Sequence, residues 1–184
     1  ANFGVEDFLL VNPKANLEDA RKFASHGVGL LEKAEICLFE DLIKRFDYLV
    51  GTTAVLSGRS TNILRSAITP AALKDCLKRF KGSVCLVFGR DTTGLTNKEI
   101  EACDIVVNIP TGTSYPTLNL AHAAAIILYE LSQLGRWGGL KIAPRRDRAR
   151  IVKYAVELAN LSKFPQHRIT LLEKAVKKVL GKGN

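Results

Sequence analysis

The chain has 184 residues, enough for one ordinary domain with a hydrophobic core and an appendage. Hydrophobic residues make up 47% and aromatic residues 7%, which excludes a mainly disordered chain. No apolar run approaches the roughly 20 residues that a membrane span needs, so we expect no membrane partner.

The positive charge is concentrated near the C-terminus. Residues 1–135 contain 14 Lys and Arg against 15 Asp and Glu, whereas residues 136–184 contain 13 against 3. A basic segment beside a near-neutral body indicates a polyanionic partner, most simply nucleic acid. The alternative is a solvated helical face with no partner.

The cysteines and histidines do not suggest a metal centre. The three histidines are scattered, and no two cysteines form a C-x-x-C pair, so we expect no metal. Free buried thiols in a reducing cytoplasm are the simplest interpretation. The four cysteines are Cys37, Cys76, Cys85 and Cys103.

Five apolar runs of strand length alternate with helical patterns. The runs are mostly continuous rather than alternating, which is typical of parallel strands buried on both faces. The order predicts an α/β domain with right-handed crossovers. The predicted strands are Phe8–Val11, Glu35–Phe39, Tyr48–Thr52, Ser83–Phe88 and Asp104–Ile109.

Several helix starts carry capping signals. Asn16, Thr69 before Pro70, and the box Thr96-x-x-Glu99 each favour a helix that begins at the next residue or shortly after it. A longer segment, Leu118–Leu134, is apolar on most faces and should be largely buried. The capped helices are predicted over Leu17–Ser25, Ala71–Phe80 and Asn97–Cys103.

A glycine-rich break divides the last quarter of the chain from the rest. We predict a domain over residues 1–134, a linker over 135–144 and a basic helical extension over 145–184. The extension contains two amphipathic helical patterns, Arg145–Leu161 and Ile169–Leu180, which should pack on the body or on a partner subunit.

Three predicted strands end in small or polar residues, at 51–54, 88–91 and 109–119. Ligands of open parallel sheets bind beyond the carboxyl ends of the strands, so these loops predict one shared site. Neither G-x-G-x-x-G nor a P-loop occurs, which disfavours dinucleotides and nucleoside triphosphates. Asp91 and Thr117 have a local alternative as turn and cap residues. Asn119, placed in the first turn of an apolar helix, is harder to explain without a partner.

The run Leu86–Leu131 resembles the signature of the SPOUT class of RNA methyltransferases. The motifs F-G-x-[ED]-x-x-G-L, C-D, I-P and [ST]-L-N-L occur in order and at matching spacing. The closest resemblance is to the tRNA (cytidine/uridine) ribose 2′-O-methyltransferases of the TrmH/TrmJ group, with the archaeal TrmJ type favoured by Asn12-Pro13. The resemblance covers residues 1 to about 134.

The resemblance implies a parallel, Rossmann-like α/β sheet whose C-terminal part is tied in a deep trefoil knot, followed here by a short helical extension. It implies S-adenosylmethionine as cofactor, S-adenosylhomocysteine as product, and a homodimer through the knot helices. The residues that would bind the cofactor, carried over by position, are Thr52, Thr53, Ala54, Gly89, Ile109, Pro116, Thr117 and Leu118.

The implied reaction is methylation of a ribose 2′-hydroxyl in tRNA or rRNA, most simply in the tRNA anticodon loop at a position of the 32 type. Asp91 and Asn119 would serve in catalysis, and Arg90, Arg145, Arg146 and Arg148 would contact RNA. The family's first motif contains an Arg that would lie upstream of Phe3-Gly4, so we expect the chain as given to lack that group.

Three alternatives stay open. The first is a catalytically inactive domain of this class that binds RNA or the cofactor. The second is a nucleotide-binding α/β protein unrelated to RNA, which the near-neutral body permits. The third is a methyltransferase that acts on protein.

Overall fold

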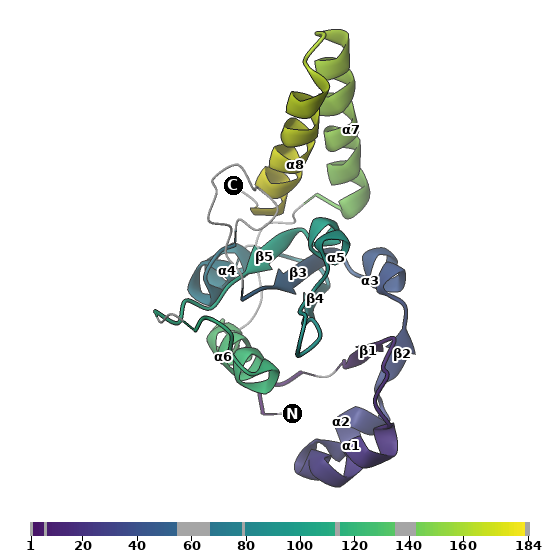
Figure 1. Cartoon of the computed structure of the whole chain (residues 1–184), viewed down its shortest axis with the longest axis vertical. Coiled ribbons are helices and arrows are strands. Elements are labelled where there is room, and N and C mark those ends of the chain that lie inside the picture. Colours follow the sequence, from purple (N-terminus) through teal and green to yellow (C-terminus); the bar gives the residue numbers. More distant parts are fainter. Residues whose placement is uncertain are drawn as a thin grey trace. The chain divides into compact units, whose positions relative to one another are not determined.

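The structure is a computed structural model (Figure 1). It describes residues 2–5, 7–54, 67–78, 80–112, 115–134 and 143–182. Contacts between residues divide the chain into two units, Ala1–Arg45 and Phe46–Asn184, and each is described by itself.

The first unit is a small parallel α/β element. Strands β1 (Leu9–Val11) and β2 (Glu35–Cys37) pair in parallel, with Leu10 opposite Ile36. Ile36 is 59% exposed, so the expected burial of both faces is wrong for β2. The helices of this unit are α1 (Leu17–Ala24), the 3-10 helix η1 (Ser25–Gly27), α2 (Val28–Glu32) and α3 (Phe39–Arg45).

The second unit is built on a three-stranded parallel sheet in the order β4-β3-β5. The strands are β3 (Tyr48–Thr52), β4 (Val84–Val87) and β5 (Ile105–Val107). Val50 lies opposite Leu86 on one side and Ile105 on the other, so all three carboxyl ends meet at one edge. The parallel pairing is confirmed. The five predicted strands form two sheets in the described residues rather than one.

Helices cover both faces of this sheet. On one face, α4 (Pro70–Leu77) and α6 (Leu120–Ser132) pack on β3 and β5. Helix α5 (Asn97–Ala102) lies on the other face. The packing there is close, because a Cβ atom on Gly51 would come within 2.8 Å of the Sγ atom of Cys103, the C-cap residue of α5. The core cluster on the first face is Tyr48, Val50, Leu73, Leu77, Phe80, Ile105, Val107, Ile127 and Leu131.

The predicted capping residues hold their helices as expected. Asn16 Oδ1 accepts from Glu18 N at 3.0 Å, and Thr69 Oγ1 accepts from Ala72 N at 3.2 Å. Thr96 and Glu99 form the reciprocal capping box of α5. The predicted start of the long apolar helix at Leu118 is wrong, because α6 begins at Leu120. Its predicted burial is also wrong, since Ile126 is 41% and Tyr129 58% exposed.

The end of the chain forms a helical hairpin of α7 (Arg145–Leu161) and α8 (Gln166–Lys182), which lie side by side (Figure 1). Helix α7 has its predicted bounds, whereas α8 begins three residues before the predicted Ile169. Val152, Ala159 and Ile169 are buried, but Val179 is 58% exposed. Most of the predicted linker lies outside the described residues.

Candidate functional site

A cavity of about 190 Å³ lies at the carboxyl edge of the three-stranded sheet. The three strand-end loops predicted to share a site meet here. Its lining includes the end of β3, the loop after β4, the end of β5 and the start of α6. All eight residues that the resemblance assigns to the cofactor line this one cavity: Thr52, Thr53, Ala54, Gly89, Ile109, Pro116, Thr117 and Leu118.

The end of β3 is held to both neighbouring strands. Thr52 Oγ1 donates to Val87 O at 3.1 Å, and Thr53 N donates to Val107 O at 3.0 Å. Beyond β3, the side-chain amide of Asn108 donates to Thr53 O at 2.9 Å and to Ala54 O at 3.3 Å. Asn108 is 7% exposed and lines the cavity.

The sequence patterns do not single out Asn108. It stands between Val107 and Ile109 in an apolar run that reads as a buried strand. A lone amide in such a run is the signal that could have identified it, because a buried amide must find hydrogen-bond partners.

The loop after β4 folds back on itself. Arg90 N donates to Gly94 O at 3.3 Å and Gly94 N donates to Arg90 O at 2.8 Å, with Gly94 at a φ of 66°. A Cβ atom on Gly89 would come within 2.7 Å of Gly94 Cα and closer still to other backbone atoms of Gly94 and Leu95. The two arms of the loop therefore pack so closely that they leave no room for a side chain at position 89.

An ion pair closes this loop. Arg90 Nη1 and Nη2 each donate to a carboxylate oxygen of Glu99 at 3.1 Å, and Glu99 also accepts from Thr96 N at 2.7 Å. The hydrogen bond from Arg90 holds the pKa of Glu99 below its usual value. Arg90 is expected to contact an RNA phosphate, but in this structure its guanidinium is already paired with the Glu99 carboxylate.

The two expected catalytic side chains lie in different settings. Asp91 is exposed on the loop and lines the cavity. Asn119 is not among the cavity-lining residues, and it is the N-cap of α6, where its Oδ1 accepts from Ala121 N at 2.9 Å. The expectation that Asn119 lies inside a buried first turn is wrong, since the residue is exposed and precedes the helix.

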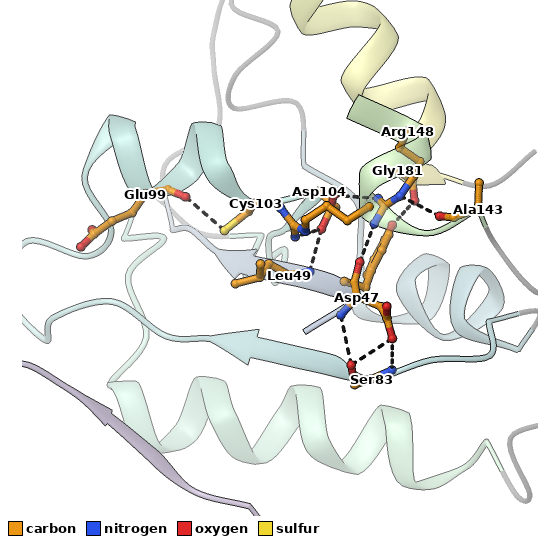
Figure 2. Close-up of polar contacts among 11 residues, drawn as sticks. Asp47, Leu49, Ser83, Glu99, Cys103, Asp104, Ala143, Arg148 and Gly181 are labelled. Carbon is orange, nitrogen blue, oxygen red and sulfur yellow. Dashed lines mark hydrogen bonds and ion pairs between the residues drawn. The ribbon is translucent and has the colours of Figure 1, made fainter. Parts of the chain in front are cut away.

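The opposite, amino-terminal edge of the sheet holds a buried network that Figure 2 shows. Arg148 donates to Asp104 Oδ1 at 2.7 Å, to Asp47 O at 2.5 Å and to Ala143 O at 3.1 Å. Arg145 Nη2 donates to Asp104 Oδ2 at 2.5 Å. Because Arg148 is only 6% exposed, the expectation that it contacts RNA phosphate gives way to a structural role.

The same network ties α8 to the sheet. The Tyr48 hydroxyl donates to Gly181 O, and the Arg148 guanidinium lies 5.4 Å from the centre of the Tyr48 ring. Burial raises the pKa of the Tyr48 hydroxyl. A side chain at Gly181 would collide with Asp104 O, so the hairpin end fits closely on the sheet edge. The hairpin is therefore anchored at the edge away from the cavity.

Cys103 shares this region with the network (Figure 2). Its thiol donates to Glu99 O at 3.2 Å, and burial raises its pKa to about 12. Among the described residues, no group of three or more His, Cys, Asp or Glu side chains is arranged to hold a metal ion. No helix in the described ranges combines the length and apolar character needed to cross a lipid bilayer.

Two curated relatives align with about seven tenths of the chain. A tRNA (cytidine-2'-O-)-methyltransferase TrmJ from Methanocaldococcus jannaschii is 39% identical over 132 residues, 71% of this chain and 57% of that protein. The protein of the same name from Sulfolobus acidocaldarius is 37% identical over 132 residues, 71% of this chain and 55% of its own length. The chain thus spans little more than half the length of these relatives.

A solved structure resembles this chain in fold. The alignment with TrmJ from Z. mobilis ZM4 covers 98% of this chain and 80% of that chain, with a TM-score of 0.66. The sequence identity is 21%, so the likeness is one of fold alone. The model of the SpoU rRNA Methylase family matches residues 1–129. The chain belongs to the SpoU methylase family.

Proposed function

We propose that this protein is an S-adenosylmethionine-dependent ribose 2′-O-methyltransferase that acts on tRNA. The observation that carries the proposal is the single cavity that the eight residues assigned by resemblance line together. Relatives 37–39% identical that bear the name of a tRNA (cytidine-2'-O-)-methyltransferase support the reaction class.

The lining suits a cofactor without phosphate groups. Its charged side chains among the described residues are Arg90 and Asp91, and Arg90 is already paired with Glu99. The hydroxyl groups of Thr52, Thr53 and Thr117 can form hydrogen bonds with the neutral edges of adenine and ribose. When bound, S-adenosylmethionine would supply the methyl group through its sulfonium centre.

The residues of the chain would mainly position the reactants. A ribose hydroxyl is a weak nucleophile, so in-line alignment at near-attack distance supplies much of the rate enhancement. Asp91, which is exposed and lines the cavity, would accept a hydrogen bond from the RNA. In the net reaction, an O–C bond forms as the S–C bond breaks, and the hydroxyl proton leaves to a base.

The RNA would also contact the hairpin. Its exposed basic side chains can neutralise phosphates, which position RNA without reading its sequence. The hairpin and the cavity lie at opposite edges of the sheet, and the central strand between these edges is roughly 15 Å long. A folded tRNA is longer than this distance, so one tRNA can contact both. These side chains are Arg146, Arg150, Lys153, Lys163, Arg168 and Lys177.

We also propose that the protein works as a homodimer through α6 and that the loops around the cavity belong to a trefoil knot. The family resemblance is the source of both ideas. Exposed apolar side chains on α6 support the first, since Ile126 is 41% and Tyr129 58% exposed. Substituting Tyr129 with Glu should convert a dimer into monomers in sedimentation experiments. A wild-type monomer would contradict the dimer.

The decisive assay uses the full-length protein, labelled S-adenosylmethionine and unmodified tRNA transcripts. We expect 2′-O-methylation in the anticodon loop, at a nucleotide of the position 32 type, mapped by resistance of the neighbouring phosphodiester bond to alkali. Methylation of a base, or of protein instead of RNA, would contradict the proposal. Cofactor or RNA binding without transfer would support the inactive alternative.

A further inference from the structure

We infer that Asn108 is a positioning residue that holds the Thr53–Ala54 wall of the cavity in the shape that accepts the cofactor. This inference rests on the proposed function of the cavity. Neither the motifs of the sequence nor the carried-over cofactor residues include Asn108.

The geometry at Asn108 differs from ordinary strand pairing. One side-chain amide nitrogen donates to two successive carbonyls, Thr53 O at 2.9 Å and Ala54 O at 3.3 Å. Successive carbonyls of a straight strand point to opposite sides, so two that converge on one donor require the chain to turn. The turn occurs directly after β3 ends at Thr52, and Ala54 lies in a bend.

The backbone around Asn108 is already paired. Asn108 N donates to Ile68 O at 3.0 Å, and Val107 O accepts from Thr53 N at 3.0 Å. Backbone pairing between β3 and β5 reaches as far as Thr53 N. The Asn108 side chain takes over at the next two carbonyls, where the chain leaves the sheet and becomes a wall of the cavity.

The burial of Asn108 makes the contact specific. Among the described residues, the buried polar side chains are Asn108, at 7% exposure, and Arg148, which anchors the hairpin at the other edge. A side chain without donors at position 108 leaves the Thr53 and Ala54 carbonyls to seek other partners. The wall then relaxes, and its backbone and hydroxyl groups lose the arrangement that fits the cofactor.

The test compares two variants of nearly equal shape with a control. Asn108→Asp keeps the size but, when ionised, offers only acceptors to the two carbonyls. Asn108→Leu removes all polar atoms. The control is Val152→Ala, which creates a small defect in α7, away from the cavity, where Val152 is 7% exposed.

The measurement is calorimetric titration with S-adenosylhomocysteine, alongside thermal unfolding. We expect both Asn108 variants to raise the Kd at least tenfold, while Val152→Ala leaves the Kd within twofold at a comparable loss of Tm. In the transfer assay the KM for the cofactor should rise, with a much smaller change in kcat at saturation.

The outcomes separate the two proposals. If the wild-type protein binds S-adenosylhomocysteine and the folded Asn108→Asp variant binds equally well, the inference about Asn108 is overturned while the cavity keeps its function. If the wild-type protein gives no binding, both are overturned. If Val152→Ala weakens binding as much as the Asn108 variants at equal Tm, the effect is one of general stability and Asn108 has no positioning role.

Discussion

Arg148 and Asp104 form a buried ion pair, with 2.7 Å between Nη1 and Oδ1 and only 7% and 13% of the two side chains exposed. Asp104 also accepts from Leu49 N at 2.8 Å and from Arg145, so one carboxylate joins β3 to the start of α7. The pair explains how a hairpin of two helices, which buries little surface by itself, is held to the sheet.

Removing one partner of this pair should be costly. We expect Arg148→Met to lower the free energy of unfolding by about 2 to 4 kcal/mol. Asp104 keeps Arg145 as its remaining ion-pair partner. The carbonyls of Asp47 and Ala143 lose their charged donor. Urea unfolding measures the loss. Arg146→Met, at an exposed position on the same helix turn, is the matched control and should change stability by less than about 0.5 kcal/mol. Equal effects of the two variants would contradict the anchoring role.

Exposed basic residues of the hairpin should act on RNA affinity rather than on stability. Arg146→Gln is expected to weaken tRNA binding and to reduce the slope of log K against log salt by about 1, as loss of one phosphate contact does. Filter binding or fluorescence anisotropy across a salt series measures it. A wild-type affinity that does not change with salt would remove the electrostatic argument altogether.

Gly89 should tolerate no side chain. Gly89→Ala places a Cβ against backbone atoms of Gly94 and Leu95, so the two arms of the loop must separate. We expect a loss of about 1 to 3 kcal/mol in stability together with weaker cofactor binding.

Gly29→Ala is the control. Gly29 lies in helix α2, and a Cβ atom there would meet no other atom within 4 Å. It should be neutral or stabilise by up to about 1 kcal/mol. Full cofactor affinity in Gly89→Ala would show that the loop does not shape the cavity.

The Cys103 thiol should make the protein sensitive to alkali. Its pKa is raised by burial from 9.0 to about 12, so above pH 9 the unfolded thiol loses its proton while the folded thiol keeps it. The stability that comes from keeping the Cys103 thiol protonated is fully present below pH 9 and is lost as the pH rises towards 12. At pH 10.5 the loss amounts to about 2 kcal/mol.

Urea unfolding at pH 8 and pH 10.5 checks this effect in the wild type and in Cys103→Ala. In Cys103→Ala, the fall in the free energy of unfolding between pH 8 and pH 10.5 should be smaller by about 2 kcal/mol. Tyr48, whose pKa is also raised by burial, contributes equally in both proteins and cancels in the comparison. An unchanged pH dependence would contradict the buried state of the thiol.

Local signals in the sequence predict much of this fold. Tyr48–Thr52 and Arg145–Leu161 match their elements, because continuous apolar runs and helical periodicity depend on nearby residues. The caps at Asn16, Thr69 and Thr96 are local in the same way. The meeting of three strand ends at one cavity follows from the parallel pairing of these strands.

Partners far apart in the chain are not predictable in this manner. Arg148 looks like one more charge of a basic helix until Asp104, 44 residues earlier, is found beside it. Asn108 looks like an interruption of a strand until the Thr53 and Ala54 carbonyls are placed. Short helices such as α2 and α3 carry no strong periodicity and were absent from the predicted elements.

The central claim is that the cavity at the carboxyl edge of the sheet is the cofactor site. A crystal structure of the protein with S-adenosylhomocysteine tests it most directly. We predict the cofactor in the cavity, in contact with Thr52, Gly89 and Ile109. Density for the cofactor elsewhere on the protein, with this cavity empty, would contradict the account.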